Sequence, residues 1–500
     1  MDILTLFVVI PLLTITGMMF GRNDKQVKWV AAGGMFIQLV MAGVLIFMFL
    51  NERAAGNTAE MLFMKDVVWF PSLNIHYLVG VDGVSVAMIA LTSIVIFAGI
   101  FASWEVKELH KEFFLFLILL STGVFGFFIS LDLFTMFVFY EIAVIPMYLL
   151  IGIWGSGPRE YSAMKLTLML MGGSALVMVG LLGLYFYSNP AGGPLTFNLL
   201  EIAKVHIPIE MQRVFFPLLF VGFGVLGALF PFHTWSPDGH ASAPTAVSML
   251  HAGVLMKLGG YGCFRVAVFL LPEAAHELAW IFIILTATGV IYGAFGAIWQ
   301  KDLKYINAYS SVSHCALVLF GILMFNQTAM NGAILQMISH GIMTALFFAL
   351  IGMIYGRTHT RYIDEMGGLM KVIPFLGVCY VIGGLASLGL PGFSGFVAEM
   401  TIFVGAFQNA DTFHRVATII AVSSIVVTAV YILRVVGILL LGKIKNDHYL
   451  ELTDAKWYEK LSTGILIISI TAIGVAPFWL SHMINGGLEP IIRRLMMVVQ

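Results

Sequence analysis

The sequence has few charged residues and few cysteines. Only 11% of its 500 residues are charged and 60% are hydrophobic, whereas a soluble domain is usually about 25% charged. This composition excludes a soluble globular fold and indicates a membrane protein with many spans. The net charge of −1 provides no large basic surface for nucleic acid. The cysteines stand at unrelated spacings in apolar stretches, which excludes a disulfide framework or a cysteine-based metal cluster; they are Cys263, Cys315 and Cys379.

Motifs for nucleotide or redox cofactors are also missing. The sequence contains no GxGxxG after a strand, no P-loop, no HExxH and no haem-attachment motif. We therefore expect any energy source to come from partner proteins or from an ion gradient. The first apolar segment, MDILTLFVVIPLLTI, lacks a basic flank and a small-residue cleavage site. We interpret it as a first membrane span and not as a cleaved signal.

Apolar runs long enough to span a membrane recur along the chain, and they predict an all-α integral membrane protein with about fourteen transmembrane helices. Two segments contain helix-breaking residues: the seventh ends in Pro231-Phe-His-Thr-Trp-Ser-Pro-Asp238, and the twelfth contains Leu390-Pro-Gly-Phe-Ser-Gly395. We expect both to be discontinuous helices. The predicted segments are 3–20, 28–49, 80–103, 112–130, 132–153, 162–187, 213–232, 243–271, 277–299, 303–325, 329–354, 368–408, 414–441 and 461–484.

The lysines and arginines of the predicted loops are unevenly distributed. If the N-terminus is outside, sixteen of them fall in inside loops and seven in outside loops. This bias predicts that both termini are outside, which requires an even number of helices. The two interrupted segments suggest, by analogy with transporters, two inverted five-helix repeats. The predicted division is 1–111 (helices 1–3), 112–271 (first repeat, helices 4–8), 272–441 (second repeat, helices 9–13) and 442–500 (helix 14 and a short tail).

Six ionisable side chains within the predicted spans form a candidate functional set. The most informative is Lys257, because it lies near the centre of segment 243–271, where a lysine costs about 2.5–3.5 kcal/mol on insertion scales. Such residues normally face the bundle interior and mark ion or proton pathways. Acid, amine and imidazole groups that face one axis can pass protons to one another. The candidates are Glu141, Lys165, Lys257, His314, His340 and Glu399.

Each candidate also has a purely structural explanation. Lys165, like Lys304, could extend its amine to the inner surface, and either histidine could be a hydrogen-bonded core residue. Glu141 could be a neutral carboxyl group that holds a neighbouring helix. Glu399 could accept hydrogen bonds from exposed amides at the broken helix, and Lys257 could belong to a static ion pair. The protein would then be a membrane scaffold, but the size of the set favours a proton pathway.

Three ordered motifs resemble those of the antiporter-like membrane subunits of respiratory complex I. The resemblance covers about residues 80–440. The first motif is Pro231-x-His-x-Trp-x-Pro-Asp-x-His240, which continues through Ala243-Pro-Thr245 to Val254-Leu-Met-Lys257-x-Gly-x-Tyr261. The second is Asp302-Leu-Lys304 followed by Ala308-Tyr-Ser-Ser-Val-Ser-His314. The third is Asp132-Leu followed by Glu141 and Pro146-Met-Tyr.

Two features resemble the M-type members of this family. The twelfth segment carries Glu399, where the L- and N-type subunits have a lysine, and the chain ends some sixteen residues after the last predicted span. That tail leaves no room for the long lateral helix of the L-type subunit. Subunits of multi-subunit cation/proton antiporters are the alternative.

The resemblance implies a proton-translocating subunit of a bacterial NADH–quinone oxidoreductase in the inner (plasma) membrane. Glu141 would be the acid of the input site, Lys165 the sixth-helix lysine and Lys257 the central lysine. Lys257 would be linked through His314 and His340 to Glu399 at the exit. The resemblance implies no cofactor or metal in this chain. It places NAD, FMN, iron–sulfur clusters and quinone in partner subunits, which include the L- and N-type antiporter-like subunits.

One position departs from the family pattern. The seventh helix of the family usually carries a lysine that pairs with the fifth-helix glutamate, but Leu226 stands there, and no lysine occurs between residues 205 and 256. Glu141 therefore lacks its expected partner. Since the predicted fifth and sixth helices are neighbours in sequence, we hypothesise that Lys165 replaces the missing lysine.

Overall fold

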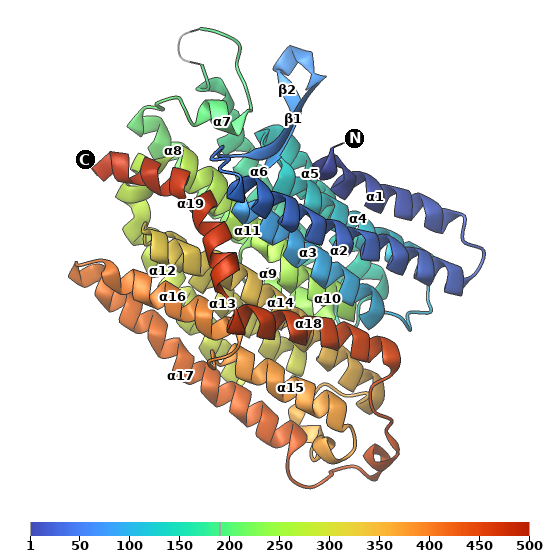
Figure 1. Cartoon of the computed structure of the whole chain (residues 1–500). Helices are drawn as coiled ribbons and strands as arrows, with labels where there is room; N and C mark the ends of the chain where they lie inside the picture. The colour runs from blue at the N-terminus through green and yellow to red at the C-terminus, as the bar shows by residue number, and fades with distance from the viewer. Residues whose placement is uncertain (1, 190–191, 500) are drawn as a thin grey trace.

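The computed structural model describes residues 2–189 and 192–499, which form a bundle of long helices (Figure 1). The first part of the chain contributes three long helices and, against expectation, a two-stranded antiparallel hairpin. Strand residues Val67 and Val68 are β-branched and the connecting Asn74 takes a left-handed conformation, as hairpins favour. The elements are α1 (Ile3–Met19), α2 (Asp24–Ala54), β1 (Leu62–Phe70), the 3₁₀ turn Pro71–Leu73, β2 (Ile75–Val81) and α3 (Gly83–Ala102).

A first group of helices follows α3. Its last membrane segment is a single helical run in which α-helical and π-helical turns alternate. The elements are α4 (His110–Ile129), α5 (Leu133–Trp154), α6 (Arg159–Phe186), the short α7 (Leu199–Ile202), α8 (Ile209–Leu226), α9 (Trp235–Ser242), α10 (Thr245–Leu250), the π-helical η2 (His251–Leu255), α11 (Met256–Gly262) and the π-helical η3 (Cys263–Val268).

A second group and the C-terminal helices complete the bundle. The predicted single helix 461–484 is divided between two helices, α18 and α19, and the second of these continues through most of the expected short tail. The elements are α12 (Pro272–Trp299), α13 (Leu303–Ile322), α14 (Gln327–Thr358), the 3₁₀ turns Ile363–Glu365 and Leu369–Lys371, α15 (Pro374–Ser387), α16 (Ser394–Gln408), α17 (Thr412–Leu440), the 3₁₀ turn Asp447–Glu451, α18 (Trp457–Val475) and α19 (Phe478–Val499).

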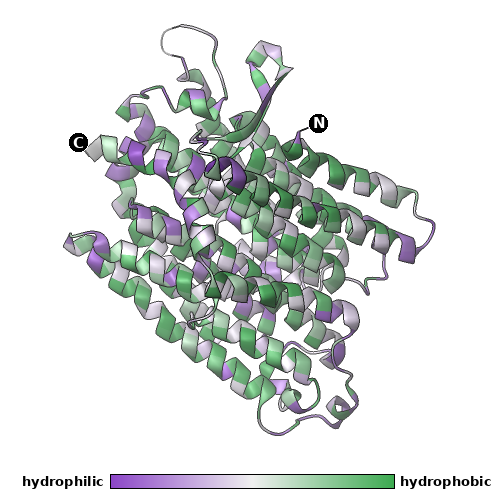
Figure 2. Cartoon of the chain, viewed as in Figure 1, coloured by the Kyte–Doolittle hydropathy of each residue, from purple (hydrophilic) through white to green (hydrophobic). Residues whose placement is uncertain are grey.

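The helices are predominantly hydrophobic, as the green colour of most of their ribbons in Figure 2 shows. Among the described residues, eleven helices are long and apolar enough to cross a membrane, namely α2, α3, α4, α5, α6, α8, α12, α13, α14, α17 and α18. The two shorter apolar helices α1 and α15 do not reach that length. Every predicted segment contains helix, but the number of fourteen crossings stays a prediction.

The two interruptions lie where the sequence predicts them. The chain leaves helical structure between α8 and α9, and again between α15 and α16. In the second break Gly389 and Gly392 have positive φ angles of 66° and 99°, which glycine adopts more readily than any other residue. The two breaks are partly exposed on the side of this chain, with Leu390 43% and Phe232 38% exposed.

The two ends of the bundle differ in composition. We call one the basic end; it consists of the loops that join α1 to α2, α3 to α4, α5 to α6, α12 to α13, α14 to α15, and α17 to α18. Contacts tie these loops together: Lys111 donates to the carbonyl of Met19, and Arg361 donates to that of Ala241. The opposite end, with the β1–β2 hairpin, is the hairpin end. Both ends of the chain lie there, since Thr5 contacts Tyr77 and His276 contacts the carbonyl of Leu495.

The two groups of helices repeat one packing scheme in opposite directions. Asp132 caps α5 at the hairpin end and Asp302 caps α13 at the basic end, each accepting a hydrogen bond from a backbone amide of its helix. The first helix of each group packs closely on the second through a glycine: a Cβ added at Gly123 or at Gly293 would lie 2.4 or 2.5 Å from a backbone nitrogen of the facing helix. This arrangement is the predicted pair of inverted repeats.

Candidate functional site

Lys257 is buried in the middle of the bundle, with 1% of its surface exposed. It lies in α11 directly after the π-helical turn η2, and π-helical turns are frequent at functional sites. Its Nζ donates to the carbonyl oxygen of Ala252 at 2.5 Å and lies 2.7 Å from Nδ1 of His340 on α14. The amine of Lys257 therefore has two partners, an imidazole and a carbonyl group. Neither is a carboxylate, so Lys257 does not belong to a static ion pair.

Three more candidates continue from Lys257 without interruption. The ring of His340 stacks on that of His314 on α13 with centroids 5.1 Å apart. Nδ1 of His314 lies 3.3 Å from a carboxylate oxygen of Glu399 on α16 and 3.0 Å from the amide nitrogen of Gln336. All of these side chains are at most 7% exposed. We call Lys257, His340, His314 and Glu399 the central row. The amine–imidazole and imidazole–carboxylate pairs lie 2.7 and 3.3 Å apart, and the two imidazoles between them are stacked.

The broken helix positions the carboxylate at the end of this row. Glu399 is the sixth residue of α16, so it lies beyond the first turn and does not cap the helix, which removes that structural alternative. The backbone of the break packs against it, because a Cβ added at Gly389 would lie 3.1 Å from Oε2 of Glu399. Ser394, at the start of α16, hydrogen-bonds to Ser339 of α14 at 2.8 Å. These contacts hold the two halves of the break around the carboxylate.

Lys165 lies outside the central row and does not contact Glu141. Its Nζ forms an ion pair with Asp238 of α9 at 2.6 Å, and Tyr305 of α13 donates to the other oxygen of that carboxylate at 3.0 Å. The side chains of Lys165 and Asp238 are each 25% exposed. The hypothesis that Lys165 replaces the missing seventh-helix lysine was wrong, because the lysine is already paired with an acid on a different element.

Glu141 is also separate from the central row. Its carboxylate is half-buried beside the Ser174 hydroxyl of α6, and its Oε1 is buried without a hydrogen-bond partner among the described residues. Leu226, which stands where the family has a lysine, is fully buried at the end of α8. Among the described residues, Glu141 contacts a serine hydroxyl, whereas Glu399 lies beside an imidazole.

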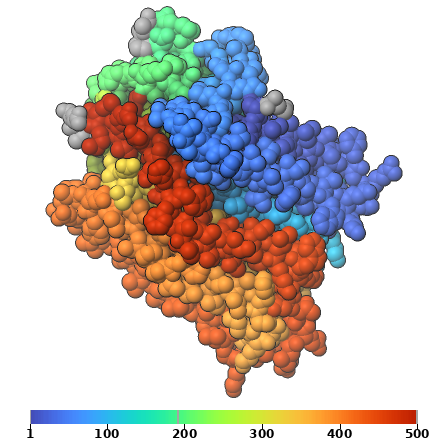
Figure 3. Space-filling model, in the orientation of Figure 1, coloured from blue at the N-terminus to red at the C-terminus, as the bar shows by residue number. Residues whose placement is uncertain are grey.

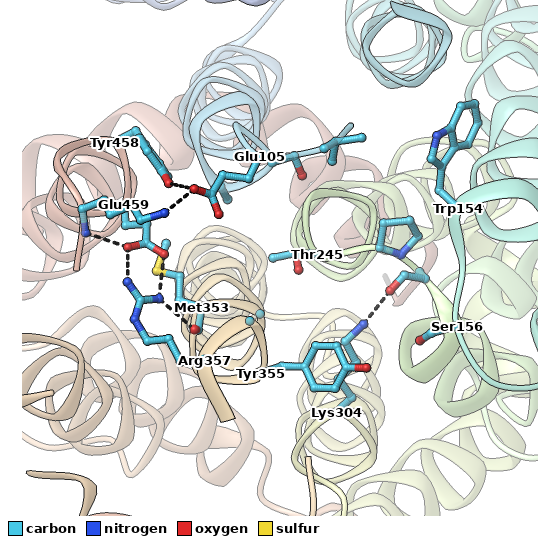
Figure 4. A pocket seen from close by; sticks show the side chains of 18 of the residues that line it. Glu105, Trp154, Ser156, Thr245, Lys304, Met353, Tyr355, Arg357, Tyr458 and Glu459 are labelled. Atoms are coloured by element: carbon cyan, nitrogen blue, oxygen red, sulfur yellow. Dashed lines mark hydrogen bonds and ion pairs between the residues drawn. The ribbon is translucent and has the colours of Figure 1, made fainter. Parts of the chain in front are cut away.

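The amine of Lys304 does not extend to the inner surface, which was the purely structural explanation for this lysine. It is 5% exposed, and its Nζ donates to the carbonyl oxygen of Ala243 at 2.5 Å. Figure 4 shows that it lines a cavity at the basic end, together with Thr245 and Tyr355. The cavity has a volume of about 570 Å³. Lys304 therefore lies between this cavity and the buried interior.

The opposite wall of the cavity holds two ion pairs. Arg357 binds both carboxylate oxygens of Glu459, at 2.9 and 2.6 Å. Lys456 contacts Glu105, and Tyr458 donates to the same carboxylate at 2.5 Å. These contacts hold the pKa of Glu105, which lies in the loop after α3, below its usual range. The wall is polar and charged, so the cavity is suited to water.

Other buried charges have fixed structural partners. Arg265 on η3 pairs with Asp82 at the start of α3, and both side chains are 1% exposed. Arg434 of α17 donates to the carbonyl groups of Ile298 and Gln300 at the end of α12. Among the described residues, no three His, Cys, Asp or Glu side chains are arranged to hold a metal ion.

Sequence reasoning missed two neighbours of the candidate residues. Gln336 precedes His340 by one helical turn, and that i, i+4 spacing places both on one face of α14, so the pattern could have identified it. Asp238 belongs to a quoted motif, but its pairing with Lys165 depends on how α9 folds back against α6. No sequence spacing predicts that contact.

A bundle of apolar helices around a row of buried amine, imidazole and carboxylate groups defines the class of membrane proteins that move ions or protons. A family model described as "NADH:quinone oxidoreductase/Mrp antiporter, TM" matches residues 130–428. The chain belongs to this family.

Full-length relatives support the same assignment. The chain is 39% identical over 415 residues to NAD(P)H-quinone oxidoreductase chain 4 3 of Picosynechococcus, which covers 82% of this chain and 74% of the relative. It is 33% identical over 480 residues to NADH-quinone oxidoreductase subunit M of Rickettsia prowazekii, which covers 95% and 96% of the two chains. The resemblance to M-type subunits is confirmed.

Solved structures share the fold. A chain of respiratory complex I from Thermus thermophilus superposes with a TM-score of 0.87 at 23% identity and covers 98% of this chain and 99% of its own length. A chain of the Mrp complex from Dietzia superposes with a TM-score of 0.82 at 19% identity, covering 99% of both chains. At these identities the likeness establishes the fold alone.

Proposed function

We propose that this chain is a proton-translocating membrane subunit of an NADH–quinone oxidoreductase, and that protons move along the central row. The observation that carries the proposal is the unbroken series of contacts from Lys257 through His340 and His314 to Glu399. Burying four titratable groups at membrane depth costs free energy, and such residues normally mark ion or proton pathways. Family membership and the relatives named as oxidoreductase subunits support this reading.

Each member of the central row has a definite part in the transfer. The protonated amine of Lys257 gives its proton to Nδ1 of His340, which lies 2.7 Å away. The stacked ring of His314 takes the proton next, and the carboxylate of Glu399 accepts it at the break between α15 and α16. Before the proton arrives, the amide of Gln336 donates to Nδ1 of His314 and holds the ring in place. When the proton leaves Glu399, the two imidazoles and the carboxylate have returned to their starting protonation states. The Lys257 amine is then neutral and must take up the next proton.

The energy for this transfer comes from partner subunits. We propose that NAD, FMN, iron–sulfur clusters and quinone are bound there, and that L- and N-type antiporter-like subunits adjoin this chain in a bacterial plasma membrane. The lysines and arginines of the basic loops support an inside location for that end, since these residues are enriched in inside loops. The cluster of Trp29, Trp104 and Trp457 rings at the basic end is typical of either membrane interface. Both termini, at the hairpin end, would then be outside.

We also propose the domain boundaries 1–111, 112–271, 272–441 and 442–500. The proposal is supported by the positions of α4, which begins at His110, and of α12, which begins at Pro272. α17 ends at Leu440, just before the last boundary. Each repeat would then be one five-helix unit.

The test is NADH-driven proton pumping and quinone reduction by membrane vesicles that carry Lys257→Ala. We expect both rates to fall by at least about tenfold, because a positioned proton carrier typically contributes more than that, while the complex still assembles. Lys443→Ala, in an exposed loop at the basic end, is the matched control and should leave both rates unchanged. Normal pumping by the Lys257 variant would refute the central row as a pathway.

A cation/proton antiporter subunit is the alternative function, and the Mrp structure has the same fold. The two functions differ in the source of energy. In vesicles that contain the intact complex, the proposed subunit acidifies the interior on addition of NADH without sodium ions. An antiporter subunit instead shows proton movement that depends on an imposed sodium gradient and not on NADH.

A further inference from the structure

Two buried histidines lie outside the central row. His240 is in α9 and His251 is in η2, six residues before Lys257; both are fully buried, and their ring centroids are 4.1 Å apart. None of their four ring nitrogens has a hydrogen-bond partner among the described residues. Buried polar atoms are nearly always hydrogen-bonded, so four unpaired nitrogens in one place require an explanation.

The histidine pair adjoins the residues around Lys304. The carbonyl oxygen of Ala243, at the end of α9, accepts from Nζ of Lys304 and from Oγ of Ser248. The same Ser248 hydroxyl also contacts the backbone carbonyl of His240 at 3.0 Å. The turn between α9 and α10 thus joins Lys304 on its cavity side to the His240–His251 pair on its interior side.

The other end of the histidine pair adjoins the central row. His251 and Lys257 lie on the same continuous helical run, and the carbonyl of Ala252, the residue after His251, accepts the Lys257 amine at 2.5 Å. The ring of His240 also stacks on Phe348 of α14, with centroids 5.1 Å apart; His340, the partner of Lys257, is on the same helix. The two imidazoles therefore lie between the cavity at the basic end and the first member of the central row.

The alternative source of protons is less well connected. Glu141 is the input acid by family resemblance, but Leu226 replaces the lysine that would link it to the interior, and the nearby Lys165 is paired with Asp238. The buried ring of Phe223 packs beside Tyr140, the neighbour of Glu141, and the backbone of Phe223 packs against Gly259, two residues after Lys257. Apolar side chains cannot carry a proton.

We propose that the central row receives its protons from the basic-end cavity through Lys304, His240 and His251, and not through Glu141. This inference rests on the proposed function of the central row. A hydronium ion in the cavity gives a proton to the Lys304 amine and becomes water. The proton moves to the imidazoles of His240 and His251 and then to the neutral amine of Lys257. Each group is restored when its proton moves on, so no other reactant is needed.

The first test removes the ring nitrogens and keeps the flat rings. We expect His240→Phe and His251→Phe each to lower NADH-driven proton pumping by at least tenfold in vesicles that contain the assembled complex. The matched control is His276→Phe, which replaces a half-buried histidine near the hairpin end and should leave pumping unchanged. Glu141→Gln should keep most of the pumping rate, because its carboxylate is outside the proposed route.

The outcomes separate this inference from the proposed function. If Lys257→Ala abolishes pumping while both histidine variants pump normally, the central row stands and the histidine route is refuted; the two rings are then stacking partners of Trp235 and Phe348. If Glu141→Gln abolishes pumping and the histidine variants do not, protons come from the Glu141 side. Normal pumping by Lys257→Ala refutes the proposed function itself.

A second test addresses the cavity without altering the buried histidines. Thr245→Cys places a thiol in the cavity wall (Figure 4), whereas the three native cysteines are buried. A membrane-impermeant sulfonated thiol reagent added to inside-out vesicles should lower pumping by the Thr245 variant several-fold. The same reagent should not affect His448→Cys, an exposed position at the basic end. Labelling without loss of pumping, or no labelling from this side, would overturn the proposed route.

Discussion

The two inverted repeats have one backbone plan and two different polar interiors. In both, an aspartate caps the second helix, and a glycine lets the first helix pack directly on its backbone. In the second repeat His314, His340 and Glu399 lie in contact with one another, whereas in the first repeat Glu141 is a single carboxylate without a charged partner. The comparison shows that one scaffold of helices holds two different sets of polar side chains, and in our proposal the function depends on those side chains.

The space-filling view in Figure 3 adds the rest of the chain to this comparison. The C-terminal helices α18 and α19 lie across the face of the bundle between the N-terminal helices and the second repeat. Asn331 of α14 donates to the carbonyl of Ser481 and to Asn485 of α19. The helix that bears His340 is therefore held from outside by α19.

The largest effect on the difference between the two repeats is expected from Glu399→Gln. An amide cannot carry the proton at the end of the central row, so we expect pumping to fall by at least about tenfold. The measurement is NADH-driven acidification of inside-out vesicles, normalised to the amount of assembled complex. Glu451→Gln, at an exposed position in the loop after α17, should pump normally. A Glu399 variant with the parent rate would mean that the two repeats do not differ in function.

Leu226→Lys would make the first repeat resemble the family pattern. A lysine buried without a partner costs about 2.5–3.5 kcal/mol even on lenient insertion scales, and we expect Glu141 to offset much of that cost. The single variant should assemble, whereas Leu226→Lys combined with Glu141→Gln should yield several-fold less complex.

For the single variant Leu226→Lys and the double variant with Glu141→Gln, the measurement is the amount of assembled complex in the membrane. Glu141→Gln alone is the control and should assemble normally. Equal assembly of the single and double variants would show that position 226 does not face Glu141 in this chain.

A smaller effect is expected from the ion pair between Lys165 and Asp238. A double-mutant cycle between Lys165→Ala and Asp238→Ala should give a coupling energy of about 1 kcal/mol, because the pair is partly exposed and such pairs contribute little. Thermal unfolding of the purified complex measures it. The cycle between Lys165→Ala and Glu141→Ala should be additive. Coupling in the second cycle but not in the first would restore the pairing predicted from sequence.

The smallest effect concerns Glu105 at the cavity rim. Lys456 and Tyr458 lower the pKa of its carboxyl group in the folded state, so its stabilising contribution is present above the unfolded-state pKa of about 4.3 and is lost as the pH falls through the lower folded-state value. We expect Glu105→Gln to lower stability by less than about 1 kcal/mol at neutral pH. The difference in melting temperature between the parent and the variant should be largest at neutral pH and should shrink steadily as the pH is lowered below about 4. A difference that grows on acidification would contradict this assignment.

The sequence predicted most of the helices and the members of the central row. Long apolar runs specify membrane helices because no other structure satisfies the backbone there, and a charge at membrane depth such as Lys257 must face the interior. The β1–β2 hairpin and the helical α19 were missed. They lie outside the long apolar spans, where the membrane imposes no such constraint.

The partners of the buried groups were decided by tertiary structure alone. Lys165 pairs with Asp238 and not with Glu141, and Lys304 ends at the carbonyl of Ala243 and not at the surface. The depth of a side chain in the membrane can be read from the sequence, because it follows from the position of the residue along its apolar run. The partner of that side chain depends on the rotation and crossing of helices distant in sequence, and only the folded bundle sets these.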